Sequence, residues 1–489
     1  MKGDGMLTVT TNPRTGSAGA SSGAGFGRRD FLRIGALSLG SLTLADLVAA
    51  RAVAGEDFVR DRSVVLLYLS GGASHIETFD PKLTAPPEIR SMTGEAATPI
   101  PGVTFGGTFP QLARLADRMA VVRSFHHGVG DHVKAHVHVL TGGTDPDGAG
   151  NRGFSMGSAF ARLRGANHPA SGLPTFTVVT SPEVDGQYRN EQGRLLKGSQ
   201  PGSLGLSYAP FHHTGEDDDA GSRRSRGNKG GSLAADMQLS LPADRFDDRR
   251  SLLRELDNLN RQIDARGGLA GVDKLNEQAA NLVLGGAAAA FDVKGEDPRL
   301  LQRYDTSHIR IGHKVFRPST LGRQMLLARR LCEAGCGFVT VHSAGWDMHA
   351  DGNNPGIVKG MEMLGRSVDK AVSAFLEDVR QRGLSDKILL VITGDFGRTP
   401  KVNSRGGRDH WSRLGTLAFA GGGLNMGQVV GQSARGADVP ATEPYTTSHL
   451  MATVMHSLFD LGKLRLASGV PREVKQAFES AAPITELVV

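Results

Sequence analysis

Short apolar runs recur along the chain and alternate with longer segments whose apolar residues have helical spacing. The run at 63–69, SVVLLYL, is apolar throughout, as expected for a strand that is buried on both faces of a parallel sheet. Comparable runs occur in MAVVRSF, TFTVVT, CGFVTVH, KILLVITG and GTLAFAG. Intervening segments such as STLGRQMLLARRLCEAG and RSVDKAVSAFLEDVRQRGL have the pattern of amphipathic helices. This alternation predicts an α/β fold, a three-layer α/β/α sandwich around a mostly parallel sheet.

The middle of the chain lacks this alternation. Residues 214–232, TGEDDDAGSRRSRGNKGGS, contain an acidic block, a basic block and almost no apolar side chain, so we predict a solvated, disordered loop. Two amphipathic helices are predicted after it, in DDRRSLLRELDNLNRQIDARG and GVDKLNEQAANLVLGGAAAAF. We therefore expect residues 181–320 to form a helical insertion, or cap, beside the sheet of a domain that spans 55–489.

Residues 1–54 have the features of an export signal. Arg28 and Arg29 form a twin-arginine pair, a weakly apolar stretch follows at 34–50, and AVA at 52–54 has the small-x-small pattern of a signal peptidase site. A membrane anchor is the alternative, but the stretch is short, rich in glycine and serine, and interrupted by an acid. We expect the twin-arginine export machinery to carry the protein to the periplasm or outside the cell, and we expect no stable transmembrane segment.

Charge and cysteine content narrow the choice of partners. The formal net charge of +6 falls to +3 without residues 1–54, which contain six Lys or Arg and three Asp. No basic helix or stripe of basic and aromatic residues stands out, so the sequence argues against a nucleic-acid partner. Cys332 and Cys336 are spaced i, i+4 at the end of a predicted helix. We predict two buried apolar residues; a disulfide and half of a metal site are the alternatives.

Polar residues gather where the predicted strands end. In open α/β sheets, ligands bind in the crevice beyond the carboxyl ends of the strands. Imidazole and carboxylate together suit zinc, manganese or iron rather than calcium alone. We therefore expect a divalent metal, zinc before manganese, iron or calcium. The clusters are Ser74, His75, Glu77 and Asp80; His126, His127, Asp131, His132, His136 and His138; His342, Asp347, His349 and Asp351; Asp395 and Arg398; and Arg408, Asp409 and His410.

Three of these residues are candidate ligands of one metal. Asp347 and His349 lie two apart in an extended segment, so their side chains point the same way and could share one ion. The glycines of GGRDHW would let that loop approach closely and bring His410 inward.

Two arginines could hold an anion beside the metal. Arg398 and Arg408 could each bind an anionic oxygen through a bidentate contact. The alternative is a buried polar network in which Asp395 pairs with these arginines and no metal binds. In HVKAHVHVLTGG, His132 and His136 have helical spacing, and they either face the site or pack against the cap.

Several of these motifs together resemble a known family. The twin-arginine leader, GGASHIETFDPK, LLARRLCEAGCGFVTV, GWDMH, GDFGRTPKVN, GGRDHW and AGGGLNMGQVVGQS stand in the order expected of the bacterial family known as domain of unknown function 1501. The resemblance covers nearly the whole mature chain, and GDFGRTP…GGRDHW is its most specific part. That family resembles the alkaline phosphatase and sulfatase superfamily, which implies an alkaline phosphatase-like α/β sandwich with metal ions at the strand ends.

The resemblance implies metal-binding roles for particular residues. Asp347, His349 and His410 resemble the Asp, His, His set of one metal, and Asp395 resembles the acid of a second metal. The superfamily usually has His directly after that acid, where this chain has Phe396.

The resemblance also implies a reaction. The superfamily's first strand usually ends on a ligand Asp, where this chain has Gly71 and Gly72. His132 aligns with the superfamily's nucleophile, so we expect it to act as nucleophile, base or ligand. The expected function is metal-dependent hydrolysis of phosphate or sulfate esters, including those of polysaccharides, with Arg398 and Arg408 stabilising charge on the transferred group. The alternative is a catalytically lapsed member that binds an anionic glycan or a partner in the cell envelope.

Overall fold

The computed structural model describes residues 58–488 apart from 146, 151, 182–184 and 215–286. The export signal predicted at 1–54 lies outside the described residues. So does the loop predicted at 214–232, apart from Thr214, and so do most of the two helices predicted after it.

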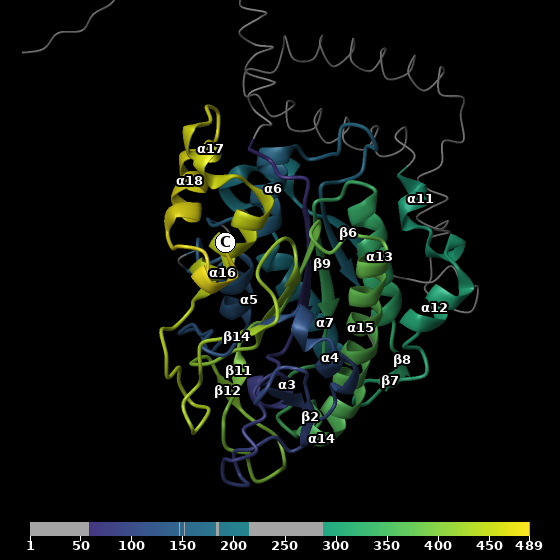
Figure 1. The fold of residues 1–489 in the computed structure, drawn as a ribbon, viewed down its shortest axis with the longest axis vertical. Coiled ribbons are helices and arrows are strands. Elements are labelled where there is room, and N and C mark those ends of the chain that lie inside the picture. Colours follow the sequence, from purple (N-terminus) through teal and green to yellow (C-terminus); the bar gives the residue numbers. More distant parts are fainter. Residues whose placement is uncertain (1–57, 146, 151, 182–184, 215–286, 489) are drawn as a thin grey trace, which may run out of the picture. The chain divides into compact units, whose positions relative to one another are not determined.

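The described residues form a mostly parallel sheet of eight strands (Figure 1). Neighbouring strands are parallel, except that β13 runs antiparallel to both β10 and β4. This confirms the predicted fold class. In spatial order the strands are β14 (Gln428–Val430), β4 (Ala120–Val122), β13 (Leu417–Gly421), β10 (Ile388–Gly394), β1 (Ser63–Leu69), β9 (Phe338–Ser343), β5 (Phe176–Thr180) and β6 (Phe211–Thr214).

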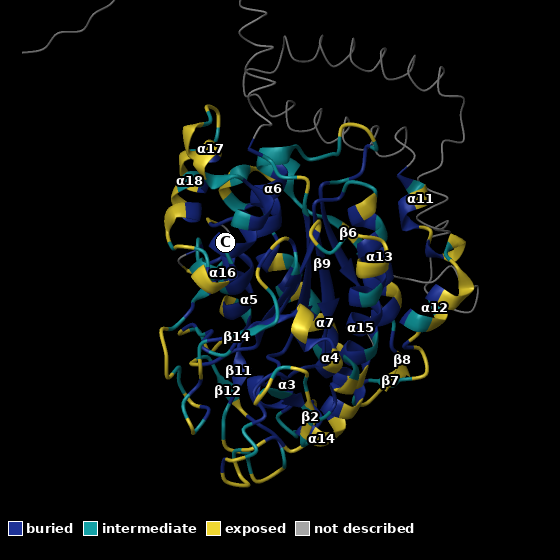
Figure 2. Ribbon diagram, viewed as in Figure 1, coloured by how far each residue is buried: buried dark blue, intermediate teal, exposed yellow. Residues whose placement is uncertain are grey.

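Helices cover both faces of the sheet because its central strands are apolar on both sides. In β1 alternate side chains enter different core clusters: Val65, Leu67 and Leu69 enter one, and Val64, Leu66 and Tyr68 enter the other. Each fully buried aliphatic side chain stabilises the fold by about 1.5–3 kcal/mol. Figure 2 shows the buried interior between the layers. The first cluster includes residues of α4 (Pro110–Arg114), α11 (Ala288–Phe291), α12 (Pro298–Tyr304), α13 (Leu321–Glu333), α14 (Ile357–Gly360) and α15 (Arg366–Gln381); the second includes residues of α5 (His132–Leu140), α6 (Met156–Arg164), α7 (Gly186–Gly198), α16 (Thr447–Leu458), α17 (Leu461–Leu466) and α18 (Arg472–Glu479).

The three central strands end level with one another. Leu69 at the end of β1 lies opposite Ser343 of β9 and Gly394 of β10. Because the three strands are parallel, the segments that follow them leave the sheet at the same edge. These segments carry most of the residues that we expected to form a site.

Part of the predicted insertion belongs to the sheet. We placed residues 181–320 beside the sheet, but β6 pairs in parallel with β5, and Phe211 lies opposite Thr177. The sequence FHHT of β6 has no apolar run, because this short edge strand is half-exposed. The helix before it, α7, packs beside α5.

Smaller elements connect these layers. A π-helical turn at Met361–Gly365 joins α14 to α15, and α3 (His75–Thr78) follows β1. Two-stranded sheets form from β2 (Glu95–Ala97) with β3 (Thr104–Gly106), β7 (Arg310–Ile311) with β8 (Arg317–Pro318), and β11 (Gly397–Arg398) with β12 (His410–Trp411). Single 3₁₀ turns lie at Ala116–Arg118, Gly202–Leu204, Leu206–Tyr208, Val293–Gly295 and Thr485–Leu487.

The two cysteines lie in the interior of the fold. Cys332 and Cys336 are both buried and free, and burial raises the pKa of the Cys336 thiol to about 11. The prediction of two apolar cysteines is therefore confirmed. None of the helices in the described ranges has the length and apolar character needed to cross a membrane.

Candidate metal centre

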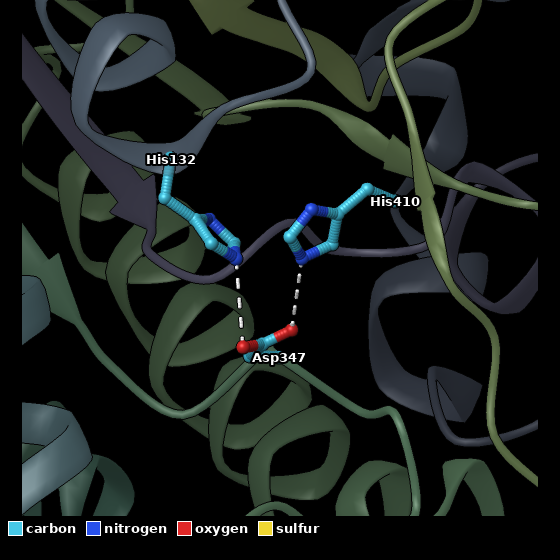
Figure 3. A group of neighbouring side chains, drawn as sticks. All are labelled: His132, Asp347 and His410. Carbon is cyan, nitrogen blue, oxygen red and sulfur yellow. Dashed lines mark ion pairs between the residues drawn. The ribbon is translucent and has the colours of Figure 1, made fainter.

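Asp347 lies beyond the end of β9, where two histidines from distant segments meet it. His132 comes from the first turn of α5 and His410 from β12. The Nε2 atom of His132 is 3.4 Å from Oδ2 of Asp347, and Nε2 of His410 is 3.6 Å from Oδ1 (Figure 3). We call these three residues the Asp347 triad.

Two nitrogens of the triad are buried without a hydrogen bond. Among the described residues, neither Nε2 of His132 nor Nε2 of His410 has a hydrogen-bond partner. The two rings lie edge to face with their centroids 4.3 Å apart. Buried polar atoms in native proteins are nearly always paired, so two orphaned nitrogens beside one carboxylate call for a ligand. Two imidazoles and a carboxylate form a common zinc ligand set.

Close backbone packing holds the segment of Asp347 in place. Gly71 has a φ of +104°, and a Cβ atom there would lie 2.6 Å from the backbone nitrogen of Asp347. A Cβ atom on Gly407 would lie 2.2 Å from the carbonyl carbon and oxygen of His349. The close approach that we expected from the glycines of GGRDHW is therefore present, and it brings His410 to Asp347.

His349 lies beside the triad, between Asp347 and Asp409. Its Nε2 is 2.9 Å from Oδ1 of Asp347, and its Nδ1 is 2.9 Å from Oδ1 of Asp409. The hydrogen bond to Asp347 raises the pKa of His349. The structure thus places this predicted ligand beside the triad, on an oxygen atom that it shares with an arginine.

Asp395 follows β10 and lies on the other side of His132. Its Oδ1 accepts a hydrogen bond from the backbone N–H of Gly71 at 3.0 Å, and its Oδ2 is 2.5 Å from Nδ1 of His132. Nδ1 of His136 is 3.6 Å from the same Oδ2. We expected Asp395 to bind a second metal; in the structure its carboxylate is occupied by N–H groups.

Arg398 cross-links the site from within. Its Nε donates to the carbonyl of Gly72 at 2.9 Å, and its Nη1 donates to the carbonyl of Arg408 and contacts Nε2 of His349, both at 3.2 Å. Its Nη2 donates to Oδ1 of Asp347 at 2.5 Å and to the carbonyl of Gly71. Four of its five N–H groups therefore donate to carbonyl or carboxylate oxygens of the protein, and the side chain is fully buried. We expected Arg398 to bind an anionic oxygen through a bidentate contact; in this arrangement its N–H groups are instead used within the protein.

Arg408 is likewise occupied. Its Nη2 is 3.0 Å from Oε1 of the fully buried Glu77. Its Nε donates to the same oxygen at 3.2 Å. The remaining N–H groups donate to the backbone carbonyls of Ile89, Arg90, Thr399 and Pro400. We expected Arg408 to bind an anion, but in the structure its N–H groups are used on these protein partners. Both arginines instead fix the loops that carry the triad.

The electrostatics of the site are dominated by its two carboxylates. Burial favours a neutral Asp347, but its contacts with His132, His349 and His410 outweigh burial and hold its pKa well below the usual range. Burial also opposes a charge on His132, yet the carboxylates of Asp395 and Asp347 raise its pKa to about 9. For His410, burial is the largest effect and lowers the pKa. The carboxylates of Asp347 and Asp395 therefore stabilise a positive charge beside them.

Three residues of the site were missed by the sequence analysis. Gln187 of α7 donates to Oδ2 of Asp347 at 3.4 Å, and Glu191 accepts the backbone N–H of Gly345 at 2.7 Å. Phe396 lies against both histidines of the triad, with ring centroids 4.7 Å from His132 and 4.8 Å from His410. No sequence signal marked α7, because we assigned its mostly polar pattern to the cap. Phe396 was noticed only as a departure from the superfamily pattern.

The sequence of the chain matches one protein family. A profile of the family described as "Protein of unknown function (DUF1501)" matches residues 61–479. No curated protein matches the chain in sequence.

Solved structures are similar only at a low level. The lipoteichoic acid synthase LtaP from Listeria monocytogenes has 10% identity and a TM-score of 0.35, with 84% of this chain and 77% of that chain covered. The PsFucS1 sulfatase from Pseudoalteromonas sp. has 11% identity and a TM-score of 0.35, covering 85% and 69%. Alkaline phosphatase from the Antarctic bacterium TAB5 has 10% identity and a TM-score of 0.32, covering 76% and 95%.

Proposed function

The chain belongs to the DUF1501 family, and we propose that it is an exported, metal-dependent hydrolase that cleaves phosphate or sulfate esters. The metal is a divalent cation, zinc by its ligand set. Substrates include anionic esters on glycans. Export follows the twin-arginine route predicted from residues 1–54, to the periplasm or beyond.

One observation carries this proposal: the two orphaned Nε2 atoms of His132 and His410 converge on the carboxylate of Asp347. These residues come from three segments that are far apart in the sequence. A structural ion pair needs no such vacancy, because its donors and acceptors satisfy one another. The Asp347 triad would hold the cation, with His349 beside it.

The other residues would prepare the site for an ester. A bound divalent cation supplies a positive charge that polarises the ester oxygen and stabilises negative charge in the transition state. Phe396 packs on both imidazole rings and excludes water from that side of the ligands. Arg398 ties Asp347 to the Gly71–Gly72 turn, so the carboxylate keeps its orientation while substrate binds.

Metal analysis and a substrate panel test the proposal. The purified full chain is assayed for zinc, manganese, iron and calcium, and is then tested on aryl phosphates, aryl phosphodiesters and aryl sulfates. We expect one of these ester classes to be hydrolysed, and hydrolysis to stop after chelation and return with metal. Protein that neither contains nor takes up a divalent metal would refute the proposal.

Single substitutions then tie the activity to the site. His410→Ala should abolish turnover, because it removes one of the two orphaned nitrogens. His456→Ala is the matched control: His456 is also half-buried but lies in the last turn of α16. Equal loss in both variants, or unchanged turnover in His410→Ala, would remove the Asp347 triad from the reaction.

Export is tested separately. Replacing both Arg28 and Arg29 with lysine should leave the full-length precursor inside the cell, while the unaltered chain appears in the periplasmic or extracellular fraction. Equal export of both chains would remove the twin-arginine route from the proposal without affecting the metal site.

A second function is favoured by the engaged arginines. Arg398 and Arg408 have acceptors in the protein for their guanidinium groups, which suits a lapsed enzyme that binds an anionic glycan or an envelope partner. Metal uptake without hydrolysis of any ester, together with retention on a sulfated glycan, would favour this alternative.

A further inference from the structure

His132 takes part in two groups of possible metal ligands, one through each of its ring nitrogens. The first group is the Asp347 triad, and the second contains His132, His136 and Asp395. An imidazole binds one cation through one nitrogen, and the partner of the other nitrogen decides which one is free. The contacts on the two sides of the ring therefore show where a cation can bind.

The Nδ1 side is closed by hydrogen bonds. Nδ1 of His132 is 2.5 Å from Oδ2 of Asp395, and Oδ1 of that carboxylate already accepts the backbone N–H of Gly71. Nδ1 of His136 donates to the carbonyl of His132 at 2.7 Å, and its Nε2 is 2.5 Å from the hydroxyl of Ser70. Ser70, His136 and Asp395 are completely buried, and the ring nitrogens and carboxylate oxygens on this side already have partners within the protein.

The Nε2 side is open. Nε2 of His132 has no hydrogen bond within the described part of the chain, and Asp347 lies 3.4 Å away, too far for good geometry. The other orphaned nitrogen, Nε2 of His410, faces the same carboxylate (Figure 3).

We infer that the metal of the proposed function binds His132 through Nε2, within the Asp347 triad. Asp395 does not ligate this metal. It is a positioning residue that accepts the Nδ1–H of His132 and so fixes the ring with its Nε2 lone pair toward the cation. Metal-bound histidines generally donate their second N–H to such a carboxylate or carbonyl. The inference rests on the proposed metal site, but it can fail on its own.

The nitrogen that carries the proton is measured directly in zinc-loaded protein. Full-length chain with ¹⁵N-labelled histidine is saturated with zinc, and the signals of His132 are identified by their loss in His132→Gln. We expect a proton on Nδ1 and zinc on Nε2. A proton on Nε2 would place zinc on the Asp395 side and overturn the inference. If no zinc binds at all, the proposed function has failed, which metal analysis of the same sample shows.

An amide at position 395 gives a second test. Both oxygens of Asp395 accept N–H groups, whereas Asn has one oxygen and an NH₂ group. The N–H of Gly71 cannot change its role, so the NH₂ of Asp395→Asn would face Nδ1 of His132. The ring must then accept at Nδ1 and carry its proton on Nε2, where it blocks the metal. We expect zinc affinity to fall about 10–100-fold.

Cobalt(II) separates a positioning residue from a ligand. At saturating cobalt, Asp395→Asn should show the same absorption bands as the unaltered protein, because the ligands are the same once bound. Changed band positions or intensities would mean that Asp395 is itself a ligand, and would overturn the inference. Asp409→Asn is the matched control, since Asp409 also contacts a histidine Nδ1, that of His349, but lies outside both groups; its cobalt bands should match those of the unaltered protein.

Discussion

Arg329 and Asp347 are each the centre of a buried cluster of charged side chains, and the two clusters differ in their partners. Around Arg329, three arginines meet three carboxylates: Arg329, Arg330 and Arg382 contact Glu296, Glu333 and Asp378. Nε of Arg329 is 2.9 Å from Oδ2 of Asp378, so charge is matched by charge. Around Asp347, one arginine is joined by imidazoles, two of which have a nitrogen without a hydrogen bond to any described residue.

The difference separates a cluster that stabilises the fold from one that is built to bind. The carboxylates raise the pKa of the Arg329 guanidinium although burial opposes its charge. The charges of its three arginines and three carboxylates therefore balance one another. The Asp347 triad favours an additional positive charge and offers the Nε2 atoms of His132 and His410 as its ligands.

The largest expected effect is on the Arg329 cluster. Arg329→Met should lower the free energy of unfolding by about 3–5 kcal/mol, because Arg330 and Arg382 alone are then left to balance three carboxylates, of which Glu296 and Asp378 are only 9% and 3% exposed. Urea denaturation measures this loss. Zinc affinity should stay unchanged, since the cluster supplies no ligand.

Arg366→Met is the control for this substitution. Arg366 is exposed, and its Nη2 is 3.2 Å from Oε1 of Glu362, one helical turn earlier. Its loss should therefore lower the free energy of unfolding by less than about 1 kcal/mol. Equal costs in the two variants, or lost zinc binding in Arg329→Met, would mean that the two clusters do not differ as described.

The second effect concerns the triad. His410→Ala should weaken zinc binding about 100-fold, equivalent to about 2.7 kcal/mol, because one ligand is lost. The free energy of unfolding without metal should change little, since the His410 side chain is 33% exposed and its Nε2 has no hydrogen bond in the described structure. Zinc competition and urea denaturation measure the two quantities. A large loss of stability with unchanged zinc affinity would make His410 a structural residue like Arg329.

The third effect comes from backbone packing. In Gly407→Ala the new methyl group would overlap the carbonyl of His349, so we expect the free energy of unfolding to fall by about 1–3 kcal/mol and zinc affinity to fall with it. Gly193→Ala is the control, because no atom lies within 4 Å of a Cβ there. It lies inside α7 and should stabilise the fold by about 0.5–1 kcal/mol. Equal behaviour of the two variants would show that the loop adjusts freely.

The smallest effect is a dependence on pH at a buried carboxyl group that forms no ion pair within the described ranges. Asp369 accepts N–H groups of Gln111 and Leu112, but burial outweighs these hydrogen bonds and raises its pKa from 3.8 to about 6. The folded state then binds more protons than the unfolded state between these values. Its contribution therefore lowers the free energy of unfolding as pH rises from about 4 to about 6.

Urea midpoints at pH 4 and pH 7 test this sign. The unaltered protein should lose more stability than Asp369→Asn between the two pH values, because the amide does not titrate. A parallel change in both proteins would mean that Asp369 is ionised in the fold like Asp347.

Much of the fold could be predicted from local pattern. The run at 63–69 coincides with β1, and the apolar segments around β9, β10 and β13 are strands because both of their faces are buried. By contrast, β6 was missed, since a short half-exposed edge strand needs no apolar run. The covering helix α7 was missed for a similar reason: it buries few of its side chains.

The site could be predicted in its members but not in their roles. The sequence placed Asp347, His132 and His410 at strand ends or loops of the same edge, and the structure brings them together. It could not show that Arg398 and Arg408 spend their N–H groups on backbone carbonyls and carboxylates, because those acceptors come from distant loops. The side of His132 on which Asp395 lies is likewise a property of the packed structure.

Anomalous diffraction at the zinc absorption edge tests the central claim most directly. Crystals of the full chain grown with zinc should show a peak at about 2.0–2.2 Å from Nε2 of His132, Nε2 of His410 and a carboxylate oxygen of Asp347. At saturating zinc, the absence of a peak at the Asp347 triad would contradict the account, as would a triad left in its ion pairs while zinc binds elsewhere.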